Sequence, residues 1–154
     1  MTNQSDKIES ANAVVKKYML GSLGVGIVPY PVVDMTLLVA LQLKMLHSLA
    51  NVYDREFSEE LGKKVIGTCL SSVVPVSLTV NLVQLFNFNW LMKGISTSAF
   101  SGAFTYAIGK LFIQHFESGN TFLSFDPQQV KEFFASQFEQ GKEEVKKNFT
   151  GIKP

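Results

Sequence analysis

Cysteine, histidine and charge are all scarce in this sequence, and each scarcity excludes a class of protein. The single cysteine, Cys69, excludes an internal disulfide framework, and its apolar neighbours predict a small buried side chain. His47 and His115 have no cysteine or carboxylate at metal-ligand spacing, so the sequence predicts no metal site. Charged residues make up 18 % of the chain, the net charge is +1 and no basic stripe is present, so we expect no nucleic-acid partner.

Motifs for catalysis and nucleotide binding are also missing. The glycines between Gly21 and Gly26 have the wrong order for a dinucleotide fingerprint, and no Gly-Lys-Ser/Thr follows them. No Gly-x-Ser-x-Gly nucleophile elbow is present. The polar N-terminus has no basic region ahead of an apolar one, which argues against a cleaved secretion signal. We therefore expect a non-enzymatic protein with no catalytic residues and no cofactor.

What the chain has in quantity is apolar sequence with helical periodicity. Apolar residues make up 46 % of it. The β-prone run 73–76 contains a proline, which argues against a central strand. The sequence predicts an all-α bundle of about five to six helices, forming a single domain over residues 1–154.

Two helices are predicted in the first third of the chain. The first has Ser5 as its N-cap and an apolar face formed by Ile8, Ala11, Val15 and Tyr18. It should end or bend in the glycine- and proline-rich stretch 21–31. The second begins between Pro31 and Asp34 and runs to about Asn51, with a stripe formed by Leu38, Leu41, Met45 and Leu49.

Asp34 is the only charged residue between Lys17 and Lys44, and a carboxylate in such a region needs a partner or water. It fits an N-cap of the second helix, a polar contact with Gln42 two turns further on, or a proton or ion site. The sequence leaves these three interpretations open.

A long apolar helical hairpin is predicted for residues 65–116. Residues 65–92 carry no charge, and Pro75 makes this run either one kinked helix or two helices. A second apolar helix follows over 95–116, interrupted only by Lys110. Trp90 and Lys93 lie at the turn, where an aromatic ring and a cation suit a membrane interface. The hairpin can enter a bilayer, or it can be the core of a soluble bundle.

The C-terminal helix is predicted to be amphipathic and to cover residues 126–149. Asp126-Pro127 combines an N-cap acid with a proline at the first helical position. The apolar residues fall close to one face, and lysine and glutamate occupy the rest. That face consists of Val130, Phe133, Phe134, Phe138, Val145 and Phe149.

Two groups of residues resemble a known family. The first group is Gly26, Pro29, Pro31, Asp34, Leu38, Gln42, Met45 and Tyr53, and the second is Tyr106, Gly109, Phe116 and Gly119. Together they resemble an uncharacterised bacterial domain, domain of unknown function 697, over roughly residues 10 to 120. That domain is related to the C-terminal part of the YcjF inner-membrane protein and is also found behind Era-like GTPase domains.

The resemblance implies a helical module that is associated with membranes and often coupled to a GTPase. The family has no agreed catalytic residues to transfer, and this chain has no G domain, so a GTPase partner would be a separate chain. We expect a module in contact with membrane lipid on the cytoplasmic side of the inner membrane, able to form a homo-oligomer and acting as a scaffold, remodeller or pore. The alternative is a soluble cytoplasmic adaptor that binds a partner through an apolar groove beside residues 29–34.

Overall fold

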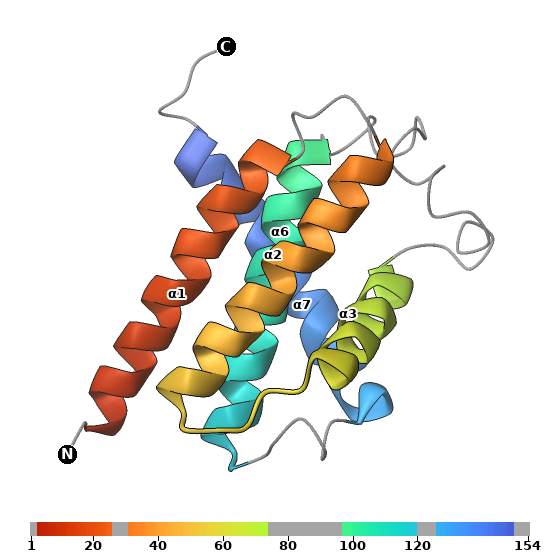
Figure 1. The fold of residues 1–154 in the computed structure, drawn as a ribbon. Helices are drawn as coiled ribbons and strands as arrows, with labels where there is room; N and C mark the ends of the chain where they lie inside the picture. The colour runs from red at the N-terminus through yellow and green to blue at the C-terminus, as the bar shows by residue number, and fades with distance from the viewer. Residues whose placement is uncertain (1–2, 26–30, 74–96, 120–125, 150–154) are drawn as a thin grey trace.

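The computed structural model describes residues 3–25, 31–73, 97–119 and 126–149 (Figure 1). These residues form five α-helices and confirm the predicted all-α bundle. The helices are α1 (Gln4–Val25), α2 (Pro31–Val52), α3 (Glu59–Val73), α6 (Thr97–Glu117) and α7 (Pro127–Phe149).

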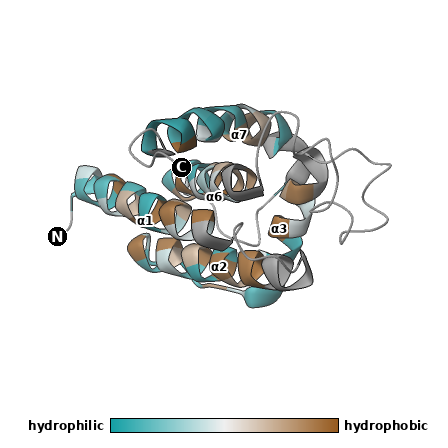
Figure 2. Ribbon diagram, turned by 90° about the horizontal axis from the view of Figure 1, so that it is seen from above, coloured by the Kyte–Doolittle hydropathy of each residue, from teal (hydrophilic) through white to brown (hydrophobic). Residues whose placement is uncertain are grey.

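Helix α6 is the centre of the bundle. It packs most extensively against α7 and α1, with α2 beside α1 and α3 against α2 and α7. Figure 2 shows α6 enclosed between α7 on one side and α1 and α2 on the other. Its largest fully buried side chains include Phe104, Ile108, Leu111 and Phe112. A helix that is apolar around its circumference needs neighbours on most sides, and the bundle supplies them.

Several predicted helix limits are confirmed. Helix α3 follows Ser58, whose Oγ accepts a hydrogen bond from the Leu61 amide at 3.3 Å, as an N-cap does. Helix α7 begins at Pro127, directly after Asp126. Beyond the end of α6, Gly119 has a φ of 81°, which is the left-handed conformation that favours glycine after a helix.

The predicted N-cap of the first helix is wrong. Helix α1 begins at Gln4, and the Asn3 carbonyl accepts hydrogen bonds from the amides of Asp6 and Lys7. Ser5 therefore lies inside the first turn. The helix passes Gly21 without a break and ends at Val25, within the glycine- and proline-rich stretch, because burial of Met19 and Ser22 outweighs the weak helix propensity of glycine.

The long apolar hairpin lies partly outside the described residues. Helix α6 coincides with the helix predicted over 95–116, but the first predicted arm is described only as far as Val73, so the hairpin stays a prediction. Trp90 and Lys93 also lie outside the described residues. Within the described part of the chain, no helix combines the length and apolarity that crossing a bilayer would require.

The two ends of the bundle differ in charge. Helices α1, α3 and α7 point their C-termini towards one end, where α2 and α6 begin (Figure 1). We call this the uncharged end after the sequence runs 18–33 and 65–92, which contain no charged residue and are described over residues 18–25, 31–33 and 65–73. The helices still bring charged residues to this end, namely Asp34 in the first turn of α2 and Lys146 and Lys147 in the last turn of α7. The opposite, charged end holds the start of α1 and the turns after α2 and α6, with Asp6, Lys7, Asp54, Arg55, Glu56 and Glu117.

Candidate functional site

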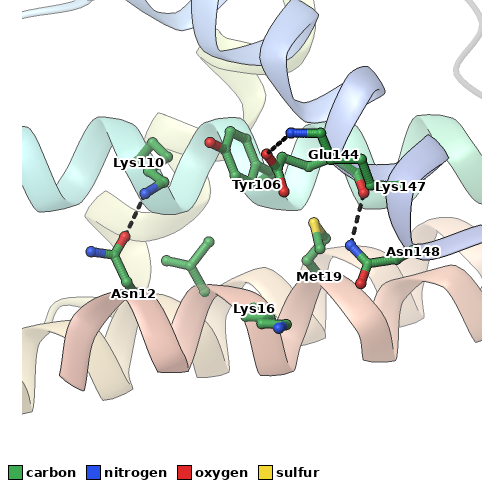
Figure 3. A pocket seen from close by; sticks show the side chains of 9 residues that line it. Asn12, Lys16, Met19, Tyr106, Lys110, Glu144, Lys147 and Asn148 are labelled. Carbon is green, nitrogen blue, oxygen red and sulfur yellow. Dashed lines mark hydrogen bonds and ion pairs between the residues drawn. The ribbon is translucent and has the colours of Figure 1, made fainter. Parts of the chain in front are cut away.

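A pocket opens on the side of the bundle over α6. Helices α1 and α7 both pack on α6, but the described residues of α1 and α7 make few contacts with each other. The space left between them is a pocket of about 350 Å³. Figure 3 shows it from close by. Its lining residues are Asn12, Val15, Lys16 and Met19 from α1, Tyr106 and Lys110 from α6, and Glu144, Lys147 and Asn148 from α7.

Lys110 is the central polar group of this pocket. Its ammonium donates a hydrogen bond to Oδ1 of Asn12 and lies 5.5 Å from the centre of the Tyr106 ring, at cation–π distance. The orientation of the Asn12 side chain is fixed by a second hydrogen bond, in which its Nδ2 donates to the Ile8 carbonyl at 3.0 Å. Burial lowers the pKa of Lys110, and the Glu144 carboxylate partly opposes this shift. The pocket therefore keeps a half-buried cation on a helix that is otherwise apolar.

The rim of the pocket carries further charges. Lys147 pairs with Glu144 at 3.4 Å, and the Asn148 side chain donates to the Glu144 backbone carbonyl at 2.8 Å. Lys16 reaches the rim from α1 and is exposed. Burial, together with the Glu144 carboxylate, raises the pKa of Tyr106, so its hydroxyl remains a hydrogen-bond donor at neutral pH. Lysines outnumber carboxylates in the lining, and the pocket has a net positive charge.

Gly109 explains how α1 comes so close to this part of α6. A Cβ at Gly109 would overlap the side chain of Val15, lying only 2.7 Å from its Cγ1. The absence of a side chain at Gly109 thus sets the spacing between the two helices that form the pocket floor. A similar close approach joins α6 to α7, where a Cβ at Gly141 would lie 2.7 Å from the Ala103 carbonyl oxygen.

The predicted site residues separate into three groups. Tyr106 and Gly109 belong to the pocket region just described. Gln42 and Met45 are fully buried in α2, where the Gln42 amide donates to Oγ1 of Thr105 at 2.6 Å, and the Thr105 hydroxyl donates to the Ser101 carbonyl at 2.8 Å. They form part of the contact with α6 and do not reach the pocket.

The third group cannot be placed beside the pocket. Gly26, Pro29, Trp90 and Lys93 lie outside the described residues. Pro31 and Asp34 lie in the first turn of α2, but their side chains are not among those described. The partner groove beside residues 29–34 and the Asp34–Gln42 contact therefore stay predictions.

Most of the pocket was not found from the sequence. Only Lys110 was noticeable in the sequence, because it is the one charged residue in the apolar stretch 95–116. Asn12, Lys16, Glu144, Lys147 and Asn148 resemble the ordinary polar residues of any amphipathic helix, and nothing in their spacing points to one another.

A second pocket, of about 290 Å³, lies at the charged end. It is lined by Gln4, Lys7, Tyr53, Arg55, Phe116, Glu117 and Gly119. Gln4 donates to the Glu117 carboxylate at 2.9 Å. Burial and the neighbouring Glu117 carboxylate raise the pKa of Tyr53, whereas Tyr53 and Gln4 lower the pKa of Glu117. Among the described residues, Oη of Tyr53, Nε of Arg55 and Oε1 of Glu117 are buried without a hydrogen-bond partner. We take the first pocket as the candidate site because it is the larger of the two and contains the half-buried Lys110.

The remaining reactive side chains have structural surroundings. Cys69 is buried as predicted, and burial raises the pKa of its thiol to about 12, so the reactive thiolate is scarce at neutral pH. The His47 ring stacks on Phe57 with 4.9 Å between the ring centres. The described residues include no group of three histidine, cysteine, aspartate or glutamate side chains arranged to hold a metal.

Comparison with known proteins identifies the family. Residues 2–143 match the sequence profile of the family described as Domain of unknown function (DUF697). The chain belongs to the DUF697 family. The matched range is longer at both ends than the stretch 10–120 in which its motifs were recognised, and it takes in all of α1 and most of α7. The pocket residues of α1 and α6 lie inside the DUF697 match, whereas those of α7, Glu144, Lys147 and Asn148, lie just beyond it.

A curated relative is Magnetosome membrane protein 22 of Magnetospirillum gryphiswaldense. It is 33 % identical to this chain over 137 residues, which cover 86 % of this chain and 70 % of the relative. No solved structure matches the chain.

Proposed function

We propose that this DUF697 protein is a non-enzymatic helical module that attaches to a membrane through the uncharged end of its bundle. The observation that carries the proposal is that the described parts of two uncharged runs, residues 18–25, 31–33 and 65–73, lead to the same end of the fold. Apolar segments at one end of a bundle are suited to the apolar boundary of a bilayer, and the lysines that end α7 there can meet anionic headgroups, whereas the charged end is suited to water.

Exposed apolar residues near that end support the proposal. Leu20 on α1 and Leu37 on α2 are each 43 % exposed, although both are large apolar side chains. Lys16 and Lys17 lie one helical turn behind Leu20 in the sequence, where cations can meet anionic headgroups. The name of the magnetosome membrane relative agrees with a membrane location, and the family resemblance favours the cytoplasmic side of the inner membrane.

The proposal includes protein partners as well as lipid. The resemblance to GTPase-linked modules supports a GTPase supplied by another chain, and the exposed Leu20 and Leu37 favour self-association on the membrane as a scaffold, remodeller or pore. Affinity purification of the tagged protein from membranes is expected to recover a GTPase. Recovery of this chain without any GTPase would contradict that part of the proposal.

Flotation with lipid vesicles tests the membrane surface. Replacing Leu20 and Leu37 together by lysine removes two exposed leucines from the uncharged end and should lower the fraction bound to phosphatidylcholine vesicles several-fold, because burying one leucine side chain in an apolar environment contributes about 1.5–3 kcal/mol. Ile8→Lys is the matched control, since Ile8 is a 37 % exposed apolar residue near the charged end of α1. It should float like the wild type.

Two results would contradict the proposal. One is a wild-type protein that does not float with vesicles at all, which would favour a soluble adaptor. The other is an equal loss of flotation in both variants. Far-ultraviolet circular dichroism of each variant checks that the bundle is intact before the comparison is made.

A further inference from the structure

We infer that the pocket between α1, α6 and α7 binds a phosphate-type anion. Three lysines, Lys16, Lys110 and Lys147, come from three different helices to one pocket of about 350 Å³. The inference goes beyond membrane attachment and does not depend on it, because the pocket lies on the side of the bundle and a soluble phosphate would satisfy it equally well.

The position of Lys110 is the main argument. A lysine in the middle of an apolar helix has to be desolvated in part, and such a cation needs compensating partners. A lysine ammonium has three N–H donors. Among the described residues, the ammonium of Lys110 donates a hydrogen bond to Asn12. The Tyr106 ring adds only a weak cation–π contact. Glu144 is the one carboxylate in the lining and is shared with Lys147, so an anion in the pocket would supply a further acceptor and further counter-charge to Lys110.

The surrounding groups are already oriented for such a ligand. Asn12 is fixed by its bond to the Ile8 carbonyl and holds the ammonium of Lys110 at the pocket, as Figure 3 shows. The Tyr106 hydroxyl is a further donor in the lining. A ligand therefore meets two half-buried donors on α6, Lys110 and Tyr106, which reduces the entropy lost on binding, whereas Lys16 and Lys147 are exposed and become ordered when the ligand binds.

The charge of the pocket selects the kind of anion. Its lining contains three lysines and one carboxylate, Glu144, which leaves a net charge of two positive units. The Glu144–Lys147 pair is an i,i+3 pair at 3.4 Å with exposed members, and such pairs are weak enough for a ligand to displace. A phosphate monoester with two negative charges matches this balance better than a single carboxylate does.

Two sources of that chemistry are consistent with the position of the pocket. Met19 in the lining is six residues, roughly 9 Å of helix, from the end of α1 at Val25. With the uncharged end in a membrane, the phosphate of a lipid headgroup would lie near this level. A soluble phosphate compound could enter the same pocket from the solvent.

Titration with inorganic phosphate and pyrophosphate tests the site without any lipid. The full chain is titrated calorimetrically at constant ionic strength, with chloride as the reference anion. We expect the wild type to bind and Lys110→Met to bind at least tenfold more weakly. Lys63→Met is the control, because Lys63 is an exposed lysine on α3 that pairs with Glu59 and lies away from the pocket; its affinity should stay within twofold of the wild type.

A second variant tests the site without changing a half-buried residue, so that a loss of binding is not caused by misfolding. Lys16→Gln with Lys147→Gln changes only exposed side chains and should also weaken binding severalfold. Vesicles of phosphatidylcholine with or without phosphatidic acid form the lipid arm. If the source is a headgroup, Lys110→Met loses the extra binding that phosphatidic acid gives but keeps its binding to phosphatidylcholine.

The two titrations and the variants distinguish results that support the anion site from results that overturn it. Lys110-dependent binding of the soluble anions or of phosphatidic acid supports the site and names its source. Absence of binding in both arms overturns it, as does equal binding by the wild type, Lys110→Met and the double variant. Failure of the membrane proposal would instead appear as no vesicle binding with phosphate binding retained.

Discussion

At the scale of single residues, Gln42 and Thr105 place hydrogen-bonding groups inside an apolar contact between α2 and α6. Both side chains are fully buried, and they are joined by one hydrogen bond of 2.6 Å. Oε1 of Gln42 has no hydrogen-bond partner among the described residues. The pair therefore contributes to the alignment of the two helices more than to stability, since a buried polar group without a partner costs free energy.

Removing one member of this pair should be worse than removing both. Thr105→Val leaves the buried Gln42 amide without its acceptor, and we expect the free energy of unfolding to fall by about 1–3 kcal/mol. Gln42→Met combined with Thr105→Val replaces both groups by apolar ones of similar size and should recover most of that loss. Urea denaturation of the wild type, Thr105→Val and the double variant measures these differences in the free energy of unfolding. A double variant less stable than Thr105→Val would refute this account.

Lys110 should lower stability at neutral pH. Burial holds its pKa below the ordinary lysine value, so the charged form is less favoured in the folded than in the unfolded state. The cost is present while the side chain is protonated and disappears as pH rises through the folded and then the unfolded pKa. We expect Lys110→Met to be more stable than the wild type by up to about 1 kcal/mol at neutral pH, because the site is partly solvated.

The same reasoning gives a pH dependence for this difference. The gap in unfolding free energy between Lys110→Met and the wild type should narrow as the pH approaches the ordinary lysine pKa. Denaturation curves at several alkaline pH values measure the gap. A gap that stays constant, or a less stable variant, would show that the Asn12 and Tyr106 contacts outweigh the burial of the charge.

At the scale of helices, glycines set the distances of α6 from its neighbours. Gly141→Ala should reduce stability by about 1–3 kcal/mol, because its Cβ would meet backbone atoms of Ala103, which cannot move aside as a flexible side chain can. Gly67→Ala is the matched control. Nothing lies within 4 Å of its Cβ position, and it is exposed in α3, so alanine there should raise stability by about 0.5–1 kcal/mol.

Thermal or urea unfolding of the two alanine variants tests the close approach of α6 and α7. If Gly141→Ala and Gly67→Ala both raise stability, helix propensity alone would explain both changes. The contact at Ala103 would then have no special energetic role.

The helices themselves were largely predictable from local signals. Ser58, Asp126-Pro127 and Gly119 act on backbone groups within a few residues, so the sequence shows them directly. The prediction of Ser5 as N-cap was wrong because Asn3, two residues earlier, is an equally suitable cap, and the helix begins at Gln4 directly after it. The prediction that the helix ends or bends from Gly21 onwards missed its last turn, because packing of the residues around Gly21 sustains the helix to Val25.

The pocket was not predictable in the same way. Lys110 is noticeable as an interruption of an apolar run, but Asn12 and Glu144 are separated from it by 98 and 34 positions and share no sequence pattern with it. They meet only because α1 and α7 lie on neighbouring sides of α6, and a single sequence does not specify that arrangement.

At the scale of the whole molecule, the distribution of charge along the bundle axis is the feature that relates fold to function. The sequence reveals that runs 18–33 and 65–92 are uncharged, but only the alternating direction of the helices brings their described parts, 18–25, 31–33 and 65–73, towards one end, together with the lysines that end α7. The charged turns after α2 and α6 are brought to the other. A bundle with such an axis has a preferred orientation at a boundary between lipid and water.

Hydrogen–deuterium exchange of the full chain, with and without phosphatidylcholine vesicles containing phosphatidic acid, measures that orientation most directly. We predict that vesicles slow the exchange of amides in residues 18–33 and 65–96 and leave residues 53–59 and 114–119 unchanged. Slowing confined to residues 53–59 and 114–119, or no change anywhere in the chain, would contradict attachment through the uncharged end.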